Sequence, residues 1–145
     1  MADKVNDVTT NTASPPISGS QLDCAFDLKT LVEVRAQVKA YAQEAGLFNL
    51  RLYKFVIAAN EVMTNAVHHG GGTGHVRVWQ DGTRLCCEVT DHGRGMASGR
   101  STGYERPEPG TIGGWGLWFT REICEAVTIA TGENGTRISL QYPLA

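Results

Sequence analysis

The sequence predicts an α+β fold, a two-layer sandwich in which helices pack on one face of a mixed, mostly antiparallel sheet. Two observations support this prediction. The predicted elements follow the order strand, helix, helix, hairpin, long loop, helix, hairpin, which is typical of sheets with their helices segregated to one face. The chain has 145 residues, 41% of them hydrophobic, and this is enough for one compact core.

The N-terminal stretch differs in composition from the rest of the chain. Residues 1–20 are polar, contain a proline pair and show no apolar period, so we expect a disordered tail. The predicted domain occupies residues 21–145.

A strand and two helices are expected first. CAFDL, at 24–28, is a short strand candidate. In residues 29–46 apolar side chains recur at helical spacing up to a glycine, which predicts a helix that ends there. A second helix is expected from about Asn49 into NEVMTNAVHHGGG, at 60–72.

The next two elements form a predicted hairpin, followed by a long loop. HVRVWQ (75–80) and RLCCEVTD (84–91) alternate with a period of two, and the intervening Asp-Gly favours a tight turn. Residues 96–112 are rich in Gly, Pro, Ser and charge. A loop of this length is usually an active-site lid or a disordered insert, and we predict a lid at about 96–113.

A third helix and a second hairpin complete the predicted domain. GGWGLWFTREICEAV, at 113–127, opens with glycines and continues as a helix on which Phe119, Ile123 and Val127 share a face. VTIAT and TRISLQY then flank the turn GENG.

Charge and hydropathy exclude several classes of function. With 13 Lys and Arg against 15 Asp and Glu, the net charge of −2 gives no general attraction to nucleic acid or lipid. No apolar run approaches the roughly 20 residues that cross a bilayer, and no signal peptide pattern begins the chain, so we expect a cytoplasmic protein. The cysteines show no C-x-x-C pair and are interpreted as reduced thiols.

A polar stripe runs along the second predicted helix. Glu61, Asn65 and His69 follow at four-residue spacing, away from an apolar face formed by Leu52, Val56, Ala59, Met63, Ala66 and Val67. In a phosphoryl-transfer site an amide such as Asn65 can bind Mg²⁺ and a carboxylate such as Glu61 can accept a proton. Taken alone, the stripe would be interpreted first as a solvated helix face, because polar pairs at this spacing are common.

Two glycine-rich motifs follow. VTDHGRGM carries Asp91 onto the face of Leu85, where its carboxylate can accept a hydrogen bond from an exocyclic amine beside Gly93 and Gly95. In GGWGLW the helix start lacks a capping side chain, and its free amides suit a phosphate chain. The alternatives are ordinary turn residues for the first motif and a water-satisfied loop for the second.

Together, EVMTNAVHHG, DHGRG and GWGL, with a lid between the second and third, resemble the N, G1 and G2 boxes of the gyrase, Hsp90, histidine kinase and MutL (GHKL) ATPases, which have the Bergerat fold. The resemblance runs from about residue 22 to 142. No Walker-type G-x-x-x-x-G-K-[ST] motif occurs.

The resemblance implies ATP and Mg²⁺ as cofactors and assigns roles by motif position. Glu61 matches the general base, Asn65 the Mg²⁺ ligand and Asp91 the residue that reads adenine. The other matched nucleotide-binding positions are Gly93, Gly95, Gly114, Gly116, Leu117 and Thr136. The lid residues Arg100 and Arg106 are candidate phosphate contacts, and their alternative is a solvated charge. Thr136 is alternatively an ordinary strand residue.

At 145 residues, the chain is expected to lack the helical or transducer domains of the larger relatives. Within the superfamily it resembles the bacterial anti-sigma factor serine kinases of the RsbW and SpoIIAB group. That resemblance implies a serine kinase that phosphorylates an anti-anti-sigma protein of the STAS fold, sequesters a sigma factor, or does both. It also implies a homodimer. The alternatives are a catalytically silent, nucleotide-gated binding module and a kinase module with a non-sigma partner.

Overall fold

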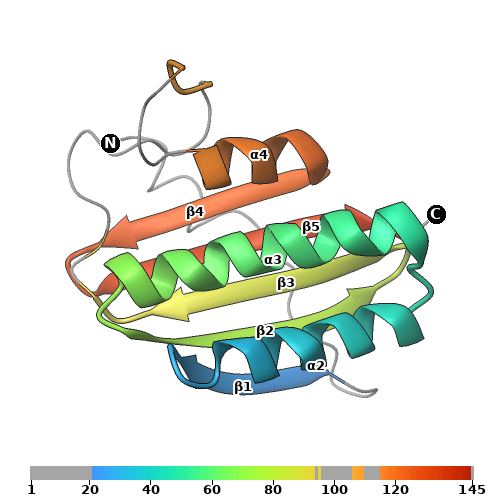
Figure 1. Cartoon of the computed structure of the whole chain (residues 1–145), viewed down its shortest axis with the longest axis horizontal. Coiled ribbons are helices and arrows are strands. Elements are labelled where there is room, and N and C mark those ends of the chain that lie inside the picture. The colour runs from blue at the N-terminus through green and yellow to red at the C-terminus, as the bar shows by residue number, and fades with distance from the viewer. Residues whose placement is uncertain (1–20, 94, 96–105, 110–114, 145) are drawn as a thin grey trace.

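The computed structural model describes residues 21–93, 95, 106–109 and 115–144 (Figure 1). Five strands and three helices lie within these ranges. In chain order they are β1 (Leu22–Asp27), α2 (Leu31–Glu44), α3 (Asn49–His69), β2 (Thr73–Asp81), β3 (Arg84–Asp91), α4 (Trp115–Ile123), β4 (Ala126–Gly132) and β5 (Gly135–Pro143).

The five strands form one sheet in the order β1-β2-β3-β5-β4, and each neighbouring pair is antiparallel. Residues 81 and 84 pair at the end of the first hairpin, and Gly82 between them has a φ of 62°, which glycine adopts at no steric cost. The Asp-Gly turn predicted from the sequence is confirmed.

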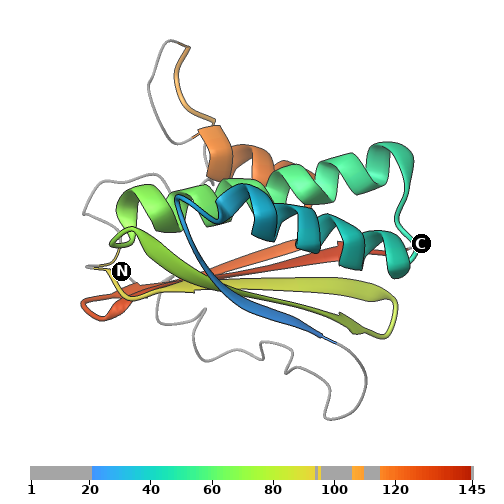
Figure 2. The ribbon, with the colours of Figure 1, turned by 60° about the horizontal axis from the view of Figure 1, so that its bottom comes forward.

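The three helices cover the same face of the sheet (Figure 2). Val76, Val78, Leu85, Cys87 and Val89 point from the central strands into the core beneath them. Val62 and Met63 of α3 are completely buried against this layer. The predicted α+β sandwich is therefore confirmed, and the apolar side of α3 is the side that holds it on the sheet.

The third helix is shorter than the sequence predicts. α4 ends at Ile123, and Val127 lies in β4, where it pairs with Leu140. The backbone N–H of Cys124 closes the last turn on Thr120, and that of Glu125 already donates to Gln141 on β5. Pairing with a strand distant in sequence outweighs the local helical pattern at this point.

The alternation along β3 separates the two adjacent cysteines. Cys87 belongs to the core beneath the helices, whereas Cys86 faces the opposite side of the sheet, and all four cysteines are free thiols. In the part of the chain that the structure describes, no helix is long and apolar enough to cross a membrane.

Candidate functional site

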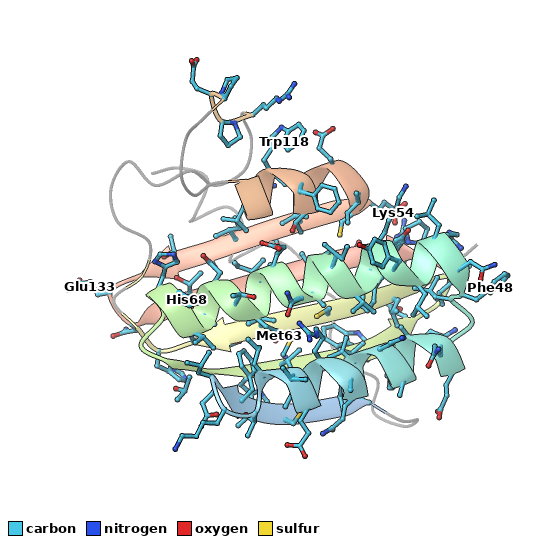
Figure 3. The ribbon with its side chains drawn as sticks, viewed as in Figure 1. Phe48, Lys54, Met63, His68, Trp118 and Glu133 are labelled. Atoms are coloured by element: carbon cyan, nitrogen blue, oxygen red, sulfur yellow. The ribbon has the colours of Figure 1, made fainter. Side chains whose placement is uncertain are left out.

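The motif residues converge at one end of the sandwich. At the left of Figure 1 lie the C-terminal end of α3, the end of β3, the start of α4 and the turn between β4 and β5. Figure 3 shows His68 of α3 and Glu133 of that turn at this same end, while Phe48 marks the opposite end. Segments that are far apart in the sequence, from α3 to β5, therefore meet here.

Asp91 is the centre of one half of the site. Asp91 is 6% exposed. Its carboxylate lies against Gly70, the residue after α3, so closely that a Cβ on Gly70 would overlap it. The backbone N–H of Gly93 donates to Asp91 Oδ1 at 3.0 Å. This bond engages one carboxylate oxygen, and no hydrogen bond from a described residue is made to the second, which can accept one from a ligand.

Two glycines allow the end of α3 and the loop after β3 to touch through their main chains. A Cβ on Gly93 would lie 2.6 Å from the Gly70 carbonyl carbon. Gly95 has a φ of 83°, and a Cβ there would lie 2.9 Å from Thr131 Oγ1. Both glycines of the second motif thus allow close packing on neighbouring segments of the chain, Gly93 on Gly70 and Gly95 on Gly132, whereas their predicted approach to a flat ring stays a prediction.

Thr136 lies beside Asp91 in the sheet. The two residues are register partners on β3 and β5, and Thr136 is 6% exposed. Its hydroxyl lies 2.9 Å from that of Thr131 on β4. The Asp91 carboxylate on β3 therefore lies beside the two hydroxyls of Thr136 on β5 and Thr131 on β4.

Glu61 forms the other half of the site with the start of α4. A Cβ on Gly116 would overlap Glu61 Oε1, so the carboxylate is pressed against the first turn of that helix. Glu61 is half-buried, and this burial raises the pKa of its carboxyl above the ordinary value. No described residue forms an ion pair with it.

Asn65 and Leu117 complete the described part of this half. Asn65 is half-buried and lies one helical turn beyond Glu61 on α3. Its amide oxygen is a chemically suitable ligand for Mg²⁺ near the Glu61 end of the site. Leu117 is 6% exposed and belongs to the core, so its side chain anchors the first turn of α4.

The lid is only partly within the described chain. The Arg106 guanidinium lies 5.7 Å from the centroid of the Trp118 ring, a cation–π contact that holds Arg106 beside α4. Arg100, Gly114 and most of the lid predicted at about 96–113 lie outside the described residues.

Two contributors had no role assigned from the sequence. Gly70, noted in the sequence only as the last residue of EVMTNAVHHG, packs on Asp91, and Thr131 pairs with Thr136. The signal for Thr131 was present, because the GENG turn makes Gly132 and Gly135 partners and so places residue 131 opposite 136. The contact of Gly70 with Asp91 could be found only once the end of α3 was known to touch the end of β3.

The two halves have complementary chemistry. One offers a carboxylate between glycines, suited to the amine of a flat base, and the other offers a glycine at a helix start, suited to anionic phosphates. They define the class as a nucleotide-binding two-layer sandwich. A family model described as a histidine kinase-like ATPase domain matches residues 24–142. The chain belongs to this family.

Solved structures show the same fold. The RsbU and RsbW domains of Rv1364c from Mycobacterium tuberculosis match with a TM-score of 0.65 and 23% identity, over 86% of this chain and 32% of that one. The histidine kinase domain of the blue-light activated kinase from Erythrobacter litoralis EL346 matches with a TM-score of 0.53 and 18% identity, over 79% and 65%. The catalytic domain of histidine kinase ThkA matches with a TM-score of 0.51 and 16% identity, over 84% of this chain and 97% of that one.

The chain therefore spans about a third of the Rv1364c chain that it matches. A search of curated proteins found no matching sequence.

Proposed function

We propose that this protein is an ATP- and Mg²⁺-dependent protein serine kinase that works as an anti-sigma factor in a partner-switching pathway. In this function it phosphorylates a serine of a STAS-domain anti-anti-sigma protein, sequesters a sigma factor, or does both. Membership of an ATPase family and an RsbW-containing structural neighbour support the proposal.

The observation that carries the catalytic part is the position of Glu61. Its carboxylate is half-buried against the first turn of α4, where the phosphates of a nucleotide would meet the helix amides. No cation among the described residues neutralises it, and burial raises its pKa toward the range useful for a general base.

The proposed transfer uses one proton acceptor and an in-line exchange of oxygens. Glu61 takes the proton of the incoming serine hydroxyl, the serine oxygen bonds to the γ-phosphorus, and the bond to the β–γ bridging oxygen breaks to release ADP. Asn65 would hold Mg²⁺, which offsets charge on the triphosphate when bound. The chain itself supplies position and an electrostatic environment.

The two halves of the site hold the two ends of ATP, the adenine ring and the phosphates. Asp91 accepts a hydrogen bond from the adenine amine, with Thr136 beside it and Gly93 and Gly95 against the ring. Gly116 lets the phosphate chain approach the start of α4. We assign Gly114 to the same phosphate end on its motif position, and Arg100 and Arg106 on their positions in the predicted lid.

The assay for this function is phosphate transfer between purified proteins. The full chain is mixed with γ-labelled ATP and each STAS-domain protein encoded in the same genome, and the labelled residue is mapped. We expect phosphoserine on one STAS protein, dependent on Mg²⁺ and absent with Glu61→Ala. Nucleotide binding without transfer to any candidate would overturn the kinase assignment and favour a nucleotide-gated binding module.

The partner assignment is tested separately. Co-elution of a sigma factor with the full chain, released when the STAS protein is added, is the result expected of a partner switch. Light scattering on the same samples measures whether the chain is the homodimer that the resemblance implies. Phosphate transfer to a different class of protein would support the assignment as a kinase but exclude a role in a sigma factor pathway.

A further inference from the structure

A row of three polar side chains crosses the sheet in the half of the site that is centred on Asp91. Asp91 on β3 pairs in register with Thr136 on β5, and Thr136 pairs with Thr131 on β4. Each of the three lies two residues from a buried core residue of its own strand, so all three share the core side of the sheet. The row therefore faces the helices, with Asp91 at one end and Thr131 at the other.

The two hydroxyls of this row form a hydrogen bond whose direction matters. Thr131 Oγ1 lies 2.9 Å from Thr136 Oγ1. A threonine hydroxyl has one proton to donate and two lone pairs that accept. If Thr131 donates to Thr136, the Thr136 proton is available to a ligand, whereas if Thr136 donates to Thr131, Thr136 offers a ligand only a lone pair. The direction of this bond therefore decides whether Thr136 acts on a ligand as a donor or as an acceptor.

The loop after β3 packs on the other side of Thr131. Gly95 lies so close that a Cβ there would be 2.9 Å from Thr131 Oγ1 and would overlap the Gly132 carbonyl oxygen. Two strand spacings, about 10 Å, separate Thr131 from Asp91, and Thr136 lies between them. A flat base held by Asp91 would therefore meet Thr136 first, and Thr131 would act on that base only through Thr136.

We propose that Thr131 is a positioning residue for base selection, which donates its proton to Thr136 and so makes the Thr136 hydroxyl a donor toward the nucleobase. This inference rests on the proposed function, in which Asp91 accepts the adenine amine. Adenine presents an amine beside an unprotonated ring nitrogen, so an acceptor and a donor side by side match it. Hypoxanthine and guanine present an oxygen and a ring N–H at the same places, and both contacts become repulsive.

The opposite side of the sheet carries a matching row that supplies the control. Thr128 on β4, Ser139 on β5 and Glu88 on β3 are register partners in the same order. They alternate with the core residues and so lie on the side of the sheet that faces away from the helices (Figure 2), which we call the helix-free face. Thr128→Val therefore removes a hydroxyl from the same strand by the same substitution, on the side away from the nucleotide.

The test compares the binding of ATP and of inosine triphosphate to the full-length chain by calorimetry, and it does not depend on phosphate transfer. In Thr131→Val the side chain keeps its shape but cannot donate, so Thr136 is free to turn either way. ATP affinity should fall roughly two- to tenfold, the effect of one neutral hydrogen bond, while the affinity for inosine triphosphate stays the same or rises. The ratio of the two affinities should therefore fall by at least the same factor. Thr131→Ser keeps the hydroxyl and should restore the ratio, and Thr128→Val should leave it unchanged.

Purine riboside triphosphate provides a second measurement, because its base has the ring nitrogen of adenine but no amine. Its binding does not use the amine contact of Asp91, so its affinity should fall in Thr131→Val by the same factor as that of ATP. A loss confined to ATP would instead assign Thr131 to the amine contact and would overturn the proposal.

Equal losses of ATP and inosine triphosphate affinity in Thr131→Val would mean that the residue only supports the strand, and would overturn this inference while leaving nucleotide binding intact. A changed ratio in Thr128→Val would overturn it as well. Failure of the proposed function is recognised earlier, because the unmodified chain would then bind ATP no more tightly than inosine triphosphate. Thr131→Ala gives the same comparison of affinities if the valine variant does not fold.

Discussion

Glu61 and Glu88 are the same residue type in two opposite electrostatic situations. Glu88, on the helix-free face, is 4% exposed and lies 2.5 Å from Arg77 Nη2 and 3.8 Å from Arg137 Nε. Glu61, on the helix side, is half-buried against Gly116, and within the described ranges no cation pairs with it. The charge of Glu88 is compensated by two arginines, whereas no described cation compensates the charge of Glu61.

This difference separates a structural carboxylate from one suited to chemistry. Arg77 and Arg137 both pair with Glu88, so its carboxylate ties β2, β3 and β5 together. Burial alone acts on Glu61 and raises its pKa, which is a feature of residues that exchange protons. Substituting each glutamate by glutamine should therefore affect different properties of the protein.

The largest expected effect is on phosphate transfer. Glu61→Gln should lower the transfer rate by about 10²- to 10⁴-fold, the contribution typical of a positioned general base. Nucleotide affinity should be kept, because glutamine preserves the shape beside Gly116. Single-turnover transfer and calorimetry measure the two quantities. Glu88→Gln is the control, and a similar loss in both variants would remove the distinction between the two carboxylates.

The sequence predicted which side of the sheet or helix the carboxylates on the helix side of the sheet, Asp91 and Glu61, would occupy. The period of β3 places Asp91 on the core face and Glu88 on the other, and the helical period aligns Glu61 with Asn65. The predicted hairpin already places Arg77 opposite Glu88, but the second partner could not be predicted, because Arg137 is brought beside Glu88 only by the pairing of β3 with β5. For the same reason the sequence extended α4 through Val127, where pairing with Leu140 makes a strand.

Asp91 provides an intermediate case. It is as buried as Glu88 but is held by the Gly93 N–H and not by an arginine, which leaves acceptor capacity for a ligand. In Asp91→Asn the amide oxygen can still accept the Gly93 N–H, but an NH2 donor replaces the second carboxylate oxygen, so ATP binding should weaken by about 1.5–3 kcal/mol, or roughly 10- to 150-fold. Calorimetry with ATP measures this change, and Glu33→Gln on the exposed side of α2 is the control. Unchanged affinity would exclude Asp91 from the adenine contact.

The third effect concerns the stability that Glu88 contributes. Glu88→Gln should lower the free energy of unfolding by about 1–2 kcal/mol, since charged hydrogen bonds are lost but the arginines regain water. The matched control is Glu125→Gln, which breaks an exposed ion pair with Arg84 at 2.6 Å and should cost under about 1 kcal/mol. Urea unfolding of both variants measures the difference. Equal effects would show that burial adds nothing to the Glu88 pair.

The smallest expected effect is an increase in stability, and it is expected when Glu61 is replaced. Because its pKa is raised on folding, the folded chain binds this proton more tightly, and stability is lost as pH rises from the unfolded pKa of about 4.3 through the folded value. Glu61→Gln should therefore be the more stable protein at pH 7, by less than about 1 kcal/mol because the group is half-exposed. Urea unfolding from pH 5 to 8 should show this gain growing with pH until Glu61 is fully ionised, with Glu33→Gln flat over the same range. A gain that shrank with rising pH would mean that an undetected cation stabilises the ionised Glu61, and that the two glutamates are alike after all.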